Sequence, residues 1–247
     1  MALNRLTVFF LVALSAATVQ GAAYPKEHFE TQSLQKNDIH ELLENLRRAI
    51  QGAIDAGEKL IGKSIEALQK LGETILAGIM AAAEKAVNKI VSEIIEIQEK
   101  AIKAGLNIEH CMINETIATL KGLPRVAFEE AEKCVFGFIK QGKDYADAGI
   151  QKIKHTLDEI TIIGDEIGKC GNDLAAIPCL AKLSIRIGVD IVQIPLAIAD
   201  QAAKTVTLIE GLKLQIPKCA TDALIRVGVE SGKLLLSVTK CVADAKK

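Results

Sequence analysis

The strongest constraint on this chain is a repeat with a spacing of eleven residues, in which almost every position is apolar. Three overlapping series share this spacing: Ile39, Ile50, Ile61, Gly72, Ala83 and Ile94; Leu43, Ile54, Ile65, Leu76 and Val87; and Leu46, Gly57, Leu68, Ile79, Ile90 and Ala101. Eleven residues over three turns gives about 3.67 residues per turn, so each series stays on one face of an α-helix. The pattern predicts a long amphipathic helical region over residues 39–106.

Glycines interrupt this region at Gly57, Gly62, Gly72 and Gly78. Glycine lowers helix propensity because it gives the unfolded backbone more freedom than any other residue. We therefore expect bends or a hairpin within residues 39–106 in place of one uninterrupted helix.

Residues 107–247 contain all six cysteines and a weak internal repeat. Residues 185–190 (IRIGVD) resemble residues 225–230 (IRVGVE), which lie 40 positions later, and Cys179 and Cys219 share this offset. Repeats of this length are typical of duplicated helical hairpins. The predicted fold is all-α, a bundle of long amphipathic helices and disulfide-stapled helical hairpins.

The beginning of the chain has the pattern of a secretory signal peptide, which we assign to residues 1–21. Arg5 precedes a short apolar core, and a small residue follows at the expected cleavage point. Residues 22–38 are polar and aperiodic, so we expect a flexible N-terminal arm there. The interpretation implies a secreted, extracellular protein.

An even number of cysteines behind a signal peptide predicts three disulfides. The six residues are Cys111, Cys134, Cys170, Cys179, Cys219 and Cys241. In an antiparallel hairpin, residues equidistant from the turn face each other. Turn signals at Gly122-Leu123-Pro124, Gly171-Asn172-Asp173 and Ser231-Gly232 therefore predict that consecutive cysteines pair: Cys111 with Cys134, Cys170 with Cys179 and Cys219 with Cys241.

Composition and motifs argue against several classes of function. A formal net charge of −1 gives no basic surface for nucleic acid. Residues 57–64 (GEKLIGKS) match the phosphate-loop pattern, but the apolar stripe of a helix runs through them and no strand precedes them. We find no catalytic, cofactor-binding or metal-binding residues. His110 beside Cys111 is an isolated pair, and we expect it to bind no metal.

Two further sites are predicted. Asn114 begins the only N-x-[ST] sequon and is a candidate for glycosylation. Residues 74–83 (TILAGIMAAA) contain no charge, and one interpretation makes them a membrane-interacting segment. Its members would be Thr74, Ile75, Leu76, Ile79 and Met80, and Ile79→Lys should then reduce membrane activity. The other interpretation, a helix turn buried on all sides in the core, remains open.

The layout of signal peptide, long Ala/Ile-rich helices and Lys-Cys pairs resembles that of a group of secreted insect proteins. The Lys-Cys pairs lie at positions 133–134, 169–170, 218–219 and 240–241. The group is called hemolysin-like and occurs in the venom and saliva of predatory and blood-feeding bugs. The chain is also similar to the cysteine-bearing helical domain of the tsetse gut EP protein. The first resemblance implies a toxin-like, membrane-disrupting role.

These observations lead to one expected function and one alternative. We expect a non-enzymatic protein that acts at lipid or membrane surfaces as a cytolytic venom or salivary component. The alternative is an extracellular carrier or a structural or interaction protein that does not disrupt membranes. The sequence does not fix the oligomeric state.

Overall fold

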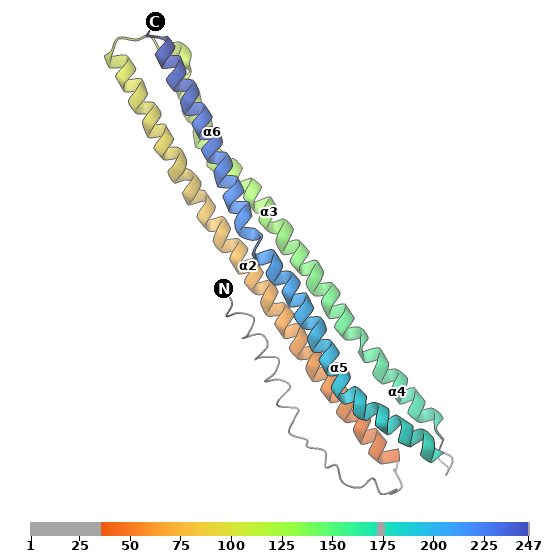
Figure 1. Cartoon of the computed structure of the whole chain (residues 1–247). Helices are drawn as coiled ribbons and strands as arrows, with labels where there is room; N and C mark the ends of the chain where they lie inside the picture. The colour runs from red at the N-terminus through yellow and green to blue at the C-terminus, as the bar shows by residue number, and fades with distance from the viewer. Residues whose placement is uncertain (1–35, 172–175, 247) are drawn as a thin grey trace. The chain divides into compact units, whose positions relative to one another are not determined.

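The computed structural model describes residues 36–171 and 176–246, apart from the side chains of Lys36, Asn37 and Glu159. The predicted signal peptide and most of the predicted arm lie outside these ranges. No strand occurs within them, so the all-α prediction is confirmed (Figure 1). The elements are α2 (Lys36–Lys103), a 3-10 turn (Glu109–Cys111), α3 (Ile113–His155), α4 (Leu157–Lys169), α5 (Ala176–Lys213) and α6 (Ile216–Asp244).

The chain divides into two compact units, and each combines distant stretches of sequence. Of the residues that the structure describes, unit 1 contains those up to Leu60 and those within Gly149–Lys204, and unit 2 contains those within Ile61–Ala148 and those from Thr205 onward. The helices α2, α3 and α5 therefore each supply residues to both units. The division does not follow the sequence regions 39–106 and 107–247, which were defined by periodicity and cysteine content.

The eleven-residue repeat of α2 forms its core face. Every member of the three series is buried except Ile65 and Ile90, which are half-buried. The expected bends or hairpin are wrong, because residues 36–103 form one helix. Two of the glycines occupy core positions. A side chain at Gly57 would meet Ile153 and Ala202 of unit 1, and one at Gly72 would meet Val135 of unit 2. Close packing against these neighbours offsets the low helix propensity of glycine.

The end of α2 is set by Gly105, whose φ of +71° lies in the left-handed region that favours glycine. The Gly105 N–H donates to the Ile102 carbonyl at 2.9 Å, and the Leu106 N–H donates to the Ala101 carbonyl at 3.1 Å. This pair of bonds is a Schellman motif, which satisfies carbonyls that the last helical turn leaves without partners.

The helix breaks predicted at Pro124 and at Ser231-Gly232 are also wrong. Pro124 lies inside α3, and Ser231 and Gly232 lie inside α6. Proline removes one helical hydrogen bond, but Leu120 and Ala127 on either side of Pro124 are buried, so the packed face of α3 continues through it. Gly171 does end a helical segment, because it follows α4 with a φ of +79°.

All six cysteines form disulfides, as predicted, but only one predicted pair is correct. Cys170 bonds to Cys179 with a Cα–Cα distance of 5.7 Å. Cys111 bonds to Cys241 at 5.7 Å and Cys134 bonds to Cys219 at 5.8 Å, so the pairs Cys111–Cys134 and Cys219–Cys241 are wrong. The reason is that α3 and α6 are continuous where the sequence suggested hairpin turns. In unit 2 these two helices are bonded to each other.

Candidate functional site

The predicted membrane segment, residues 74–83 of α2, directs its large side chains into the core of unit 2. Leu76 is 8% exposed and Ile79 is 2% exposed, while Ile75 and Met80 are half-buried and Thr74 is exposed. The exposed positions of the segment hold only small residues, namely Thr74, Ala77, Gly78, Ala81 and Ala82. In the folded chain this segment therefore exposes little apolar area that could contact a lipid surface. The segment is not buried on all sides either, because one face packs in the core through Leu76 and Ile79 while the other face is exposed.

A row of exposed aliphatic side chains lies on α5 within unit 1. The row consists of Ile185, Val189, Val192 and Leu196, which are 45–67% exposed. Their spacing of four, three and four residues keeps them on one helix face. The opposite face is buried through Ile187, Ile194 and Ile198. We call this row the α5 strip. Single exposed aliphatic residues are ordinary, but a continuous row of them marks a candidate binding surface.

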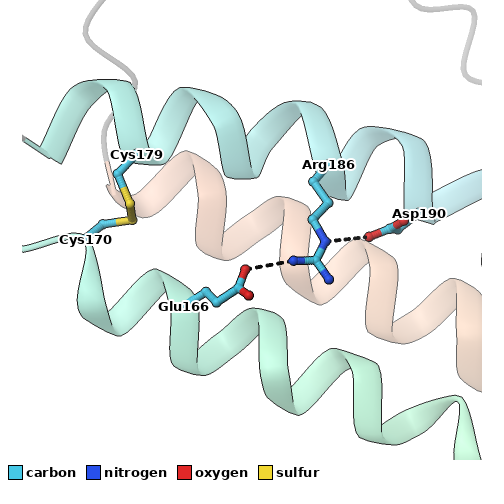
Figure 2. Close-up of polar contacts among 5 residues, drawn as sticks. All are labelled: Glu166, Cys170, Cys179, Arg186 and Asp190. Carbon is cyan, nitrogen blue, oxygen red and sulfur yellow. Dashed lines mark hydrogen bonds and ion pairs between the residues drawn. A yellow bond between two sulfur atoms is a disulfide. The ribbon is translucent and has the colours of Figure 1, made fainter.

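The region around the α5 strip contains few charges, and they form ion pairs. Residues 183–199 include only Arg186 and Asp190 as charged residues. The Arg186 guanidinium donates from Nη1 to Glu166 Oε2 at 2.8 Å. Its Nε lies 3.6 Å from Asp190 Oδ2 (Figure 2). The strip is therefore flanked by an arginine that already has two carboxylate partners.

Two connections hold the N-terminal part of α5 against α4. Cys179, in the first turn of α5, bonds to Cys170, which directly follows α4. Two turns further along α5, Arg186 bonds to Glu166 of α4 (Figure 2). We call this combination of disulfide and ion pair the α4–α5 clip. Because Ile187 is buried beside Arg186, the clip and the core together fix which face of α5 is exposed.

The phosphate-loop-like residues 57–64 lie inside α2, where the backbone amides are committed to helical hydrogen bonds. Ser64 is buried and its hydroxyl donates to Glu210 Oε1 at 3.1 Å. Lys213 Nζ donates to the same oxygen. Ser64 therefore links α2 to α5 within unit 2, and a loop that wraps a phosphate is absent from this stretch.

The predicted glycosylation site and the His110-Cys111 pair, which was expected to bind no metal, lie near the disulfide between Cys111 and Cys241. Asn114 is exposed at the second residue of α3, where a glycan could be attached. His110 is exposed, and its Nε2 lies 3.9 Å from Cys111 Sγ. His110, Cys111 and Cys241 place three residues of metal-ligating types together. Both sulfurs are consumed in the disulfide, however, so neither is a thiolate that could bind a metal.

The sequence pattern did not reveal the α5 strip, because this part of the helix has apolar residues on every face. In the run of residues 183–199, apolar residues occur at core and surface positions alike, so periodicity does not separate the two faces. The available signal was the scarcity of charge in this run. A surface helix usually carries charged residues opposite its core face, and here that face carries aliphatic ones.

Within residues 36–171 and 176–246, no helix combines the length with the apolarity needed to cross a bilayer. No protein family, curated protein or solved structure matches the chain.

Proposed function

We propose that this is a secreted, non-enzymatic bundle of amphipathic helices that binds lipid or membrane surfaces and acts as a cytolytic, hemolysin-like component. The α5 strip is the observation that carries the proposal. It supplies exposed aliphatic side chains along one helix face with no unpaired charge among them, which is the chemistry of a helix that lies in a lipid–water interface. Three disulfides are consistent with an oxidising extracellular compartment.

The α5 strip can contribute enough free energy for reversible binding to a membrane. Complete burial of an aliphatic side chain contributes about 1.5–3 kcal/mol, and roughly half of each strip residue remains to be buried. The four residues together would contribute about 3–6 kcal/mol, which is similar to the marginal anchoring by one myristoyl chain. The protein would therefore associate with a membrane without needing a spanning helix.

Leakage of a trapped dye from phosphatidylcholine vesicles tests the proposal, with Leu196→Lys compared with Leu60→Lys. Leu196 lies in the strip, whereas Leu60 is a leucine of similar exposure on α2 of the same unit. We expect wild type and Leu60→Lys to bind vesicles and release dye, and Leu196→Lys to bind about tenfold more weakly, because a charge replaces inserted apolar surface. The proposal fails if wild type neither binds nor releases dye, or if both substitutions have the same effect.

The burial of Leu76 and Ile79 favours a second candidate, an extracellular carrier or structural protein that does not disrupt membranes. In this case the apolar face of α2 stays packed and the chain does not open at a bilayer. The same vesicles distinguish the two functions, because uptake of an apolar fluorophore without dye release would support the carrier.

A further inference from the structure

The α4–α5 clip of unit 1 has a counterpart in unit 2, built from α3 and α6. There the disulfide joins Cys134 to Cys219, and Arg226 Nη1 donates to Glu130 Oε1. In both clips the glutamate precedes its cysteine by four residues and the arginine follows the partner cysteine by seven. The internal repeat found in the sequence is therefore a repeat of covalent and ionic connections between helices.

The exposed aliphatic row is repeated together with the clip. Ile225, Val229 and Leu236 of α6 lie 40 positions after Ile185, Val189 and Leu196, and they are 49–70% exposed. Gly232 occupies the position equivalent to Val192. The inner face of α6 is buried through Ala223, Val227 and Val238. We call the residues Ile225, Val229 and Leu236 the α6 strip.

We propose that the α6 strip is a second lipid-contact site, so that each unit carries one site of the same design and each contributes to binding at a phosphatidylcholine surface. This inference rests on the proposed function of the α5 strip and extends it to unit 2. Three features that recur together support it: the disulfide, the arginine–glutamate pair, and an exposed aliphatic row at the same sequence spacing from both.

Size and composition favour lipid over a protein partner. Stable protein interfaces bury about 800 Å² on each side, and their strongest contacts are usually tryptophan, tyrosine or arginine. The α6 strip has three aliphatic residues and no aromatic one, and the chain has no tryptophan. A lipid surface, in contrast, accepts a narrow aliphatic row without shape complementarity.

The charges near the strip favour zwitterionic lipid. Arg226 is paired with Glu130, and Glu230 is paired with Lys233 at 2.8 Å. Arg226, Glu230 and Lys233 are the charged residues of the stretch 223–238, and with Glu130 they form two ion pairs that carry no net positive charge to attract an anionic headgroup. The same holds for Arg186 beside the α5 strip.

Co-sedimentation with phosphatidylcholine vesicles tests the inference in the full disulfide-bonded protein. The variants are Leu196→Lys in the α5 strip, Leu236→Lys in the α6 strip and the double variant. Leu208→Lys is the control, because Leu208 is an exposed leucine of unit 2 that lies on α5 and belongs to neither strip. Circular dichroism and disulfide mapping verify that each variant is folded.

We expect each strip variant to lower the partition coefficient about tenfold and the double variant about a hundredfold, since effects at separate sites add. Leu208→Lys should match wild type. If Leu236→Lys also matches wild type while Leu196→Lys does not, the proposed function stands and this inference fails. If the wild type does not bind, both fail. If light scattering shows a dimer that Leu236→Lys dissociates, the partner of the α6 strip is a second copy of the chain, and the inference fails.

Discussion

At the scale of single residues, the glycines of α2 are of two kinds. Gly72 is buried, and a Cβ added there would lie 2.8 Å from Val135 Cγ1 and 3.0 Å from Ile139 Cδ1. Gly62 is exposed, and nothing lies within 4 Å of a Cβ added there. Both glycines lie in the middle of α2 and lower its helix propensity. Only at Gly72 do the packed neighbours leave no room for a Cβ.

Alanine substitution at these two positions should have opposite effects. Gly62→Ala should raise the free energy of unfolding by about 0.5–1 kcal/mol, because alanine restricts the unfolded chain and favours the helix. Gly72→Ala should lower it by about 1 kcal/mol, because the clash with the β-branched Val135 exceeds the gain in propensity. Urea unfolding monitored by circular dichroism measures both. Equal stabilisation by the two substitutions would show that Gly72 is not a close-packing position.

At the scale of helices, two substitutions within residues 74–83 distinguish a role of this segment in core packing from a role in lipid contact. Ile79→Lys should lower the free energy of unfolding by about 3 kcal/mol or more, because Ile79 is buried and its replacement is charged. Ala81→Lys alters the exposed face of the same segment and should change stability by less than about 0.5 kcal/mol. We expect Ala81→Lys to leave vesicle leakage unchanged. Reduced leakage in this variant would show that the segment contacts lipid in the folded protein.

The sequence pattern was sufficient to predict the core residues of α2 but not to predict where the other helices begin and end. The eleven-residue series identified Ile61, Leu68 and Ile94 as core residues because helical periodicity is a local property. The turns at Pro124 and at Gly232 were wrong because a weak local break can be outweighed by packing along the whole helix. That packing depends on residues distant in the sequence, which no local pattern reveals.

The same limitation explains the disulfides and the candidate site. Cys170 and Cys179 lie on either side of a real break, so symmetry about a turn identified their bond. The partners of Cys111 and Cys134 lie on α6, and no nearby residue indicates this. The α5 strip needed the fold for a related reason, since only the packing of Ile187 and Ile194 shows which side of α5 is exposed.

At the scale of the whole molecule, the disulfides should differ in their contribution to stability. The bond between Cys170 and Cys179 spans a separation of 9 residues, whereas that between Cys134 and Cys219 spans 85. In the chain-entropy description, closing the shorter loop contributes about 2.5 kcal/mol and closing the longer one about 4.5 kcal/mol.

Replacing both cysteines of a pair with serine tests this difference. We expect the Cys134→Ser/Cys219→Ser variant to lose about 1 kcal/mol more stability than the Cys170→Ser/Cys179→Ser variant, because the remaining bond between Cys111 and Cys241 already restrains the longer loop. Thermal and urea unfolding under non-reducing conditions provide the measurement. A larger loss from the shorter loop would mean that local contacts in unit 1, and not loop closure, set the contribution of its disulfide.

The separation of 130 residues between Cys111 and Cys241 has a consequence during synthesis. At about 5–20 residues per second, Cys111 and Cys134 wait about 4–26 s for their partners to be made. Throughout this interval the nearest available thiol for each is the other. Cys111 lies two residues before α3, and once α3 forms, its rise of about 1.5 Å per residue places Cys134 roughly 30 Å from the start of the helix. If α3 forms before α6 is synthesised, this distance keeps Cys111 and Cys134 too far apart to form the incorrect bridge.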